Sequence, residues 1–323
     1  MLIGLFFIGI IGGMFIPFQT SINSKLNMYT KSPIYASTIS FAVGTVFLIF
    51  LNLLLNPTML TFSYIEQQSV NFYWITGGLL GVIFLTGNLL LLPKLGASLT
   101  VVITLTGQMI MGVIIDTFGW LGASVQPFTF FKAVGIILLI LGIVLMNYVR
   151  NPNKKKSSLY LYVWLFLGFI FGFCPPLQTT INSQLGQQLD STIMASLISF
   201  MVGFITLLLI KILTNRNFSL KNNDKEHGKL NPFYFVGGIF GVIFITVNIF
   251  LMPYLGAALT TIAGMLGQML MALIIDQFGL LGIPKNKITF RKSIGIVLII
   301  IGIILLRFFR YRCYLKVLMA LLV

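Results

Sequence analysis

Eight carboxamide side chains in apolar stretches of this chain form four pairs that recur in its two halves, and they are the groups best suited to recognise a solute by hydrogen bonding. Gln19 and Asn23 are four residues apart, so they share one helix face, and Gln178 and Asn182 repeat the pair. A carboxamide both donates and accepts hydrogen bonds, so we expect the set to line a neutral substrate site near mid-membrane. The alternative is that the amides hydrogen-bond between transmembrane helices as packing contacts. The other four are Asn88, Gln108, Asn248 and Gln268.

Pro17 and Pro176 precede the two amide pairs. A proline inside a helix frees a backbone carbonyl and allows a kink, so we expect helix breaks beside the pairs.

Asp116 and Asp276 are the only acids within the expected membrane spans. Each falls near the C-terminal end of its span, where the helix dipole disfavours a negative charge. One interpretation is a gate that takes up a proton. The other is a helix-end carboxylate that meets lipid headgroups and water, or a neighbouring loop.

The segments that carry these residues form an internal sequence repeat. Three segment pairs are identical at 7 of 10, 15 of 24 and 11 of 16 positions, with an offset of 159 or 160 residues. Such repetition indicates one unit that was duplicated and fused, the layout of transporters whose site lies between two repeats. The pairs are 17–26 and 176–185, 77–100 and 237–260, and 107–122 and 267–282.

Composition indicates an integral membrane protein. The chain is 58% hydrophobic and 8% charged, with a mean hydropathy of +1.01, too few charges to cover the surface of a soluble protein. Apolar runs long enough to cross ~30 Å of hydrocarbon predict about ten transmembrane helices, five in each repeat. They are about 2–24, 33–55, 72–92, 95–118, 132–149, 159–183, 192–213, 233–252, 255–278 and 293–310.

We therefore predict an all-α integral membrane protein with two five-helix repeats. An odd number of spans per repeat makes the second repeat enter the membrane from the opposite side, so the repeats are expected to be inverted. The predicted organisation is a first repeat at 1–149, a basic linker at 150–158, a second repeat at 159–310, and a tail at 311–323 that has no counterpart.

The net charge of +15 is best explained by topology, and we expect no nucleic-acid partner. Basic residues concentrate in cytoplasmic loops, and 16 of the 21 lysines and arginines fall after odd-numbered spans. The linker and the 214–231 loop are therefore expected in the cytoplasm, with residue 1 and the 57–70 loop outside. Inversion then places Asp116 near the outer face and Asp276 near the cytoplasm.

The repeated motifs resemble one family. Pro-x-Gln-x-x-x-Asn-x-x-Leu, Gly-Gly-x-x-Gly-Val, Pro-x-Leu-Gly-Ala and Ile-Ile-Asp-x-Phe-Gly each occur twice, and they are similar to those of the YdcZ-like branch of the drug/metabolite transporter superfamily, in its fused two-domain form. The resemblance implies a transporter class and an architecture, without a substrate. Ten-helix relatives are usually drawn with both termini in the cytoplasm, whereas the charge bias of this chain places both outside.

The expected function is secondary transport of small metabolites or drugs by alternating access, in a multi-pass protein of the bacterial plasma membrane. The expected partners are membrane lipid and a small-molecule substrate, and a homodimer is left open. No cofactor, metal site or enzymatic activity is expected, because Cys174, Cys313 and His227 form no ligand or nucleophile pattern. The alternatives are a lipid flippase and a non-transporting membrane scaffold, and a polar pocket enclosed between the repeats would favour solute transport over both.

Overall fold

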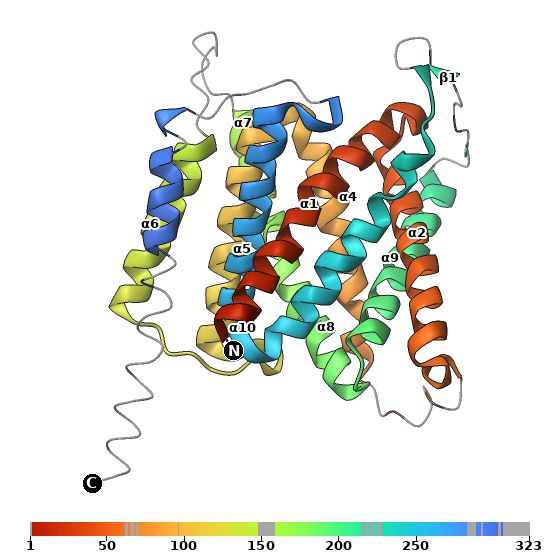
Figure 1. The fold of residues 1–323 in the computed structure, drawn as a ribbon, viewed down its shortest axis with the longest axis horizontal. Coiled ribbons are helices and arrows are strands. Elements are labelled where there is room, and N and C mark those ends of the chain that lie inside the picture. Colours follow the sequence, from red (N-terminus) through yellow and green to blue (C-terminus); the bar gives the residue numbers. More distant parts are fainter. Residues whose placement is uncertain are drawn as a thin grey trace.

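A computed structural model describes most of the chain as helix (Figure 1). The residues described are 2–61, 64, 68, 71–95, 97–147, 159–214, 218, 220, 223–224, 228–282, 289–291, 293–302 and 305. The expected linker at 150–158 and the tail at 311–323 lie outside them.

The first repeat contains five long helices. They are α1 (Leu2–Thr30), α2 (Pro33–Leu55), α4 (Gly77–Leu95), α5 (Ala97–Phe118) and α6 (Phe130–Asn147). Short 3-10 turns, η1 (Pro57–Leu60), η2 (Phe72–Thr76) and η3 (Trp120–Gly122), lie between them.

The second repeat follows the same order. Its helices are α7 (Leu159–Phe171), α8 (Cys174–Gln188), α9 (Thr192–Thr214), α10 (Gly237–Phe278) and a final helix at Ser293–Gly302. The connection from α9 to α10 contains a two-stranded antiparallel hairpin, β1 (Asn223–Asp224) and β2 (Gly228–Lys229), followed by η4 (Pro232–Phe235). The turn η5 (Leu280–Gly282) follows α10.

The membrane character predicted from composition is confirmed. Six helical stretches among the described residues are long and apolar enough to cross a bilayer. They are Leu2–Thr30, Pro33–Leu55, Phe72–Leu91, Tyr160–Gln188, Thr192–Thr214 and Pro232–Ile275, with shorter apolar helices at Ile103–Phe118, Phe130–Leu145 and Ser293–Gly302.

The longest helix, α10, contains a break that divides it into two apolar segments. Gly256 has φ +78° and ψ 172°, a conformation that residues with a side chain rarely adopt, and Pro253 precedes it. The prolines beside the amide pairs lie in different settings. Pro17 is inside the uninterrupted α1, whereas Pro176 is in the first turn of α8, where a proline removes no helical hydrogen bond.

Helices of one repeat pack on helices of the other through bare backbone. A methyl group on Gly13 in α1 would overlap the carbonyl of Gly264 in α10, and one on Gly172, just before α8, would overlap the carbonyl of Thr104 in α5. The two contacts are equivalent, because Gly172 is the repeat counterpart of Gly13 and Thr104 is the repeat counterpart of Gly264. A second pair of contacts is equivalent in the same way. Gly267 lies against the Ile10 carbonyl, and the corresponding Gly107 lies against the Phe169 carbonyl.

The second helix of each repeat makes the same kind of crossing. Gly238 in α10 lies against the Ser40 carbonyl in α2, and Gly78 in α4 lies against the Ser199 carbonyl in α9. These contacts define two groups of helices that differ from the sequence repeats. We call α1, α2 and α10 bundle one, and α4, α5, α7, α8 and α9 bundle two. Figure 1 shows α1 crossing α10 within bundle one.

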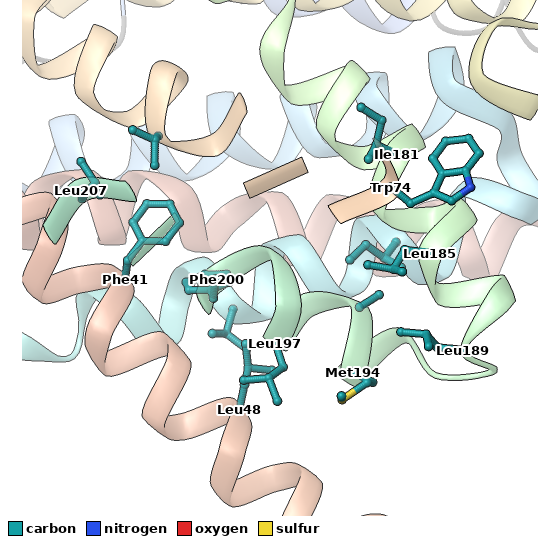
Figure 2. Packing of buried hydrophobic residues seen from close by; sticks show 14 residues of the cluster. Phe41, Leu48, Trp74, Ile181, Leu185, Leu189, Met194, Leu197, Phe200 and Leu207 are labelled. Atoms are coloured by element: carbon teal, nitrogen blue, oxygen red, sulfur yellow. The ribbon is translucent and has the colours of Figure 1, made fainter. Parts of the chain in front are cut away.

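The two bundles meet in an apolar core around a pair of phenylalanines. The Phe41 ring in α2 covers Gly203 of α9, and the Phe200 ring in α9 covers Gly44 of α2, with the ring centroids 5.1 Å apart. Figure 2 shows this pair within a buried cluster that continues along α8 and α9. Because a ring fills the space above each glycine, the two bundles are in close contact here.

A third group consists of α6 and the final helix, on the left of Figure 1. A Cβ on Gly142 would lie 2.6 Å from the Gly295 carbonyl oxygen, and one on Gly302 would lie 2.8 Å from the Gly135 carbonyl oxygen. The two helices therefore pack closely on each other through glycine faces.

Candidate functional site

The two asparagines of the repeated amide pairs each bind a serine on the next helix. Asn23 Nδ2 donates to Ser40 Oγ at 3.1 Å, and Asn182 Nδ2 donates to Ser199 Oγ at 2.9 Å. Both asparagines are 1% exposed. The hydrogen bonds fasten α1 to α2 in bundle one and α8 to α9 in bundle two.

The other end of each carboxamide faces a glycine from the opposite repeat. Asn23 Oδ1 lies where a side chain on Gly237 would begin, and Asn182 Oδ1 occupies the same place beside Gly77. Neither oxygen has a conventional hydrogen-bond partner among the described residues. Their neighbours are the glycine faces at the first residues of α10 and α4, so a glycine is required wherever the amide oxygen fills the Cβ position.

The glutamines extend the same two contacts by one helical turn. The Gln19 carboxamide lies against Gly241 of α10, and the Gln178 carboxamide lies against Gly81 of α4. Gln178 Nε2 also donates to Ser199 Oγ at 3.4 Å. Each amide pair is therefore enclosed by the second helix of its own repeat and the third helix of the other.

We expect the replacement Gly237→Ala to destabilise the protein through its contact with Asn23. The added methyl would meet Asn23 Oδ1, and overpacking of this kind costs about 1–3 kcal/mol. The added Asn23→Ala replacement removes the obstacle, so the double variant should lose less stability than the sum of the two single variants. Thermal unfolding of the four proteins in one detergent measures the coupling, and additive losses would contradict the contact.

The other four amides are dispersed. Asn248 Nδ2 donates to the Phe244 carbonyl of its own helix at 2.9 Å. Gln108 is buried, and its Nε2 has no hydrogen-bond partner among the described residues, while Asn88 and Gln268 are half-buried.

The structure thus corrects the expected arrangement of the amides. The sequence predicts one shared cavity, whereas the described residues form two closed clusters, one in each bundle. The physical reason is that a serine and a glycine on neighbouring helices complete the packing of each asparagine. The apolar Phe41–Phe200 contact belongs to the same two helices that carry the serines.

Asp116 caps the second segment of α10 at the break. Its Oδ1 accepts from the Ala257 N–H at 2.7 Å, and its Oδ2 accepts from the Ala258 N–H at 2.9 Å. The side chain is 5% exposed. These amides begin the second segment of α10, where helical N–H groups lack partners and the helix dipole favours a negative charge.

Asp116 therefore joins the two bundles, because it belongs to α5 in bundle two and its partners belong to α10 in bundle one. The unfavourable dipole at the end of its own helix is offset by the favourable one at the start of another. Sequence reasoning missed this partner, although the Pro-x-Leu-Gly motif at the break signals a helix start that needs a cap. The carboxylate of Asp276 lies outside the described side chains.

Comparisons with known proteins agree with this architecture. A family model described as "Putative inner membrane exporter, YdcZ" matches residues 4–145 and again 163–305. The chain belongs to this drug/metabolite transporter family. The double match confirms the resemblance read from the repeated motifs, including the two-domain form, and it supports a multi-pass membrane transporter.

The YdcZ match is accompanied by a likeness to a solved structure. That structure, described as "Crystal structure of protein", is 14% identical, covers 96% of this chain and 97% of its own, and superposes with a TM-score of 0.66. At this identity the likeness shows the fold alone. No curated protein matches the chain.

Proposed function

We propose that this YdcZ-family protein is a secondary transporter that exports small, neutral or weakly charged metabolites by alternating access between two inverted repeats. The observation that carries the proposal is the exchange of equivalent contacts, in which the first helix of each repeat packs on the fourth helix of the other. A two-fold relation between the repeats produces such pairs. With five crossings per repeat, the relation is an inversion across the membrane.

The proposed moving parts are bundles one and two rather than the two sequence repeats. Within each bundle the helices touch through backbone at glycines, so they cannot slide apart without losing many close contacts. Between the bundles the contacts include aromatic rings at Phe41 and Phe200, the carboxylate of Asp116, and a looser backbone approach at Gly112, where a Cβ would lie 3.3 Å from the Ala258 Cα. Side-chain contacts can be remade more readily than interlocked backbones.

In this proposal Asp116 is a latch, meaning a contact that holds the two bundles together near one face of the membrane. Its two hydrogen bonds hold α5 of bundle two against α10 of bundle one. Asp276 is the equivalent residue near the opposite face, as the repeat predicts. Release of one latch with closure of the other would give each side of the membrane access in turn.

The proposed substrate path lies between the bundles, beside Phe41 and Phe200. Ser40 and Ser199 precede these two residues in α2 and α9, and each serine binds an asparagine of the amide clusters. Separation of the rings would expose to a solute the faces of α2 and α9 that carry these two phenylalanines. The uncharged side chains of the cluster around Phe41 and Phe200 favour a neutral or weakly charged solute.

The test uses two engineered disulfides in a background that lacks Cys174 and Cys313. Gly112→Cys with Ala258→Cys joins the bundles, because a Cβ at position 112 would lie 3.3 Å from the Ala258 Cα. Gly9→Cys with Ala263→Cys is the matched control within bundle one, where the corresponding Cβ atoms would lie 2.7 Å apart. Proteoliposomes are loaded with a defined mixture of metabolites, and efflux is followed by mass spectrometry.

We expect oxidation to stop efflux in the inter-bundle variant and reduction to restore it, while the control variant transports under both conditions. Efflux no faster than from protein-free liposomes for every solute would contradict solute transport. The same vesicles with a fluorescent phospholipid in one leaflet test the flippase alternative, for which lipid movement without solute efflux is the expected result.

A further inference from the structure

A hydrogen bond between two hydroxyl groups joins the bundles. Ser196 Oγ in α9 lies 2.9 Å from Thr246 Oγ1 in α10. The Ser196 hydroxyl also donates to the Thr192 carbonyl of its own helix at 2.8 Å. Because a hydroxyl has a single proton to donate, Thr246 is the donor and Ser196 the acceptor of the bond between the helices. This bond therefore holds α9 of bundle two to α10 of bundle one.

The repeat places an equivalent pair of hydroxyl groups in α2 and α4, and this pair is not bonded. Ser37 is the counterpart of Ser196, and Thr86 is the counterpart of Thr246. Ser37 Oγ and Thr86 Oγ1 are both buried, and neither has a hydrogen-bond partner among the described residues. Buried hydroxyls without partners are destabilising and uncommon in native structures. The two hydroxyl pairs are therefore in different states.

The two pairs lie on opposite sides of the phenylalanine contact between the bundles. Phe41 of α2 covers Gly203 of α9, and Phe200 of α9 covers Gly44 of α2, so the two helices run antiparallel here. Each serine precedes the phenylalanine of its own helix by four residues, about one helical turn. In antiparallel helices, one turn back along each chain leads in opposite directions from the contact.

The bonded pair lies on the same side as Asp116. Gln184, near the end of α8, donates to the Gly122 carbonyl of η3 at 2.9 Å, and η3 follows the end of α5. The C-terminal ends of α5 and α8 therefore lie at one face, and α9 begins at Thr192, soon after α8 ends. Ser196 and Asp116 thus join the two bundles toward that face, while the unbonded pair lies toward the other.

We propose that the two hydroxyl pairs exchange as the bundles move. When the bundles part on the side of Asp116, the bond of Ser196 with Thr246 breaks, and Ser37 binds Thr86. The inference rests on the transport movement proposed above and names contacts that it breaks and makes. It explains why two buried hydroxyls lack partners here, because they are partners in the other state. The bond lost on one side is offset by the bond gained on the other.

Hydrogen exchange in lipid nanodiscs, followed by mass spectrometry, tests this proposal without a substrate. The amides of residues 196–203 in α9 exchange when the bundles part on their side, so their exchange rate follows the population of that state. Thr246→Val keeps the shape of the side chain and removes a bond of the state described here. We expect exchange at these amides to become about fivefold faster, the effect of one hydrogen bond.

Thr86→Val is the decisive variant. Its hydroxyl has no partner among the described residues, so its loss weakens only the state in which Ser37 binds it. We expect exchange at residues 196–203 to become about fivefold slower, although Thr86 lies on the other side of the phenylalanine contact. A merely structural role would give faster exchange around the replaced residue and no slowing at a distance. Wild-type or faster exchange at 196–203 would overturn the proposal.

Three further variants complete the test. Ser196→Ala and Ser37→Ala remove the other member of each pair and should repeat the results of the corresponding valine variants. Thr45→Val is the control, because that hydroxyl donates to a carbonyl of its own helix at 2.8 Å, and exchange at 196–203 should stay at the wild-type rate. Absence of efflux in the disulfide experiment would contradict the transport function and leave the exchange result standing. Normal efflux with no slowing in Thr86→Val and Ser37→Ala would overturn the hydroxyl exchange alone.

Discussion

Replacing Asp116 by alanine is expected to lower the free energy of unfolding by about 2–4 kcal/mol, because two buried N–H groups at a helix start lose a charged acceptor. The acceptor is 5% exposed, so water cannot fully replace it. The hydrogen bonds at 2.7 and 2.9 Å are short, as bonds to a carboxylate are. Thermal or denaturant unfolding in detergent measures the loss.

Asp116→Asn is the matched variant, because asparagine keeps one carbonyl acceptor and lacks the charge. We expect its stability to lie between those of the wild type and the alanine variant, since asparagine is also a good helix cap. Uptake or efflux against pH in Asp116→Asn and Asp276→Asn tests the gating hypothesis. Equal stability of all three Asp116 proteins would contradict its role at the helix break.

Replacing Gly13 by alanine is expected to produce the other large effect. The methyl would overlap the Gly264 carbonyl, and backbone atoms cannot move aside as a flexible side chain can. Separating α1 from α10 would weaken the most extensive contact in bundle one, at a cost near the upper end of the roughly 1–3 kcal/mol that is usual for overpacking. The melting temperature in detergent should fall and yield of folded protein should decrease.

Gly4→Ala provides the control within the same helix. Nothing lies within 4 Å of a Cβ built on Gly4, and alanine favours a helix more than glycine does. We expect this variant to be as stable as the wild type or slightly more stable. Similar losses in Gly4→Ala and Gly13→Ala would mean that glycine flexibility, rather than the close approach of two backbones, explains both positions.

Much of the fold could be predicted from sequence because its signals are local. Apolar runs gave helices such as α2, predicted at about 33–55 and found at Pro33–Leu55. The sequence also predicts separate spans at about 233–252 and 255–278, and the break at Gly256 divides α10 close to that boundary. Each of these features depends on neighbours within a few residues, so a single sequence carries it.

The partners of the site residues could not be predicted in the same way. The repeat shows that Asn23 and Asn182 are equivalent, but it does not show which helix either one faces. Asn23 packs against Gly237, and Asp116 accepts a hydrogen bond from the Ala257 N–H. Both contacts depend on how the two repeats interlock in space. The alternation of small and polar residues is compatible with both a cavity and a packed contact, and only the three-dimensional arrangement distinguishes them.

The central claim, that bundles one and two move as units, is tested most directly by distances between pairs of spin labels in lipid nanodiscs. Exposed positions provide an inter-bundle pair at each end of the helices, Ile3 with Gln187 and Phe278 with Tyr160. Ile3 with Leu54 is the pair within bundle one. We predict that Asp116→Asn lengthens the first distance, shortens the second, and leaves the third unchanged. Changes of the same sign at both ends, or a change within bundle one, would contradict the account.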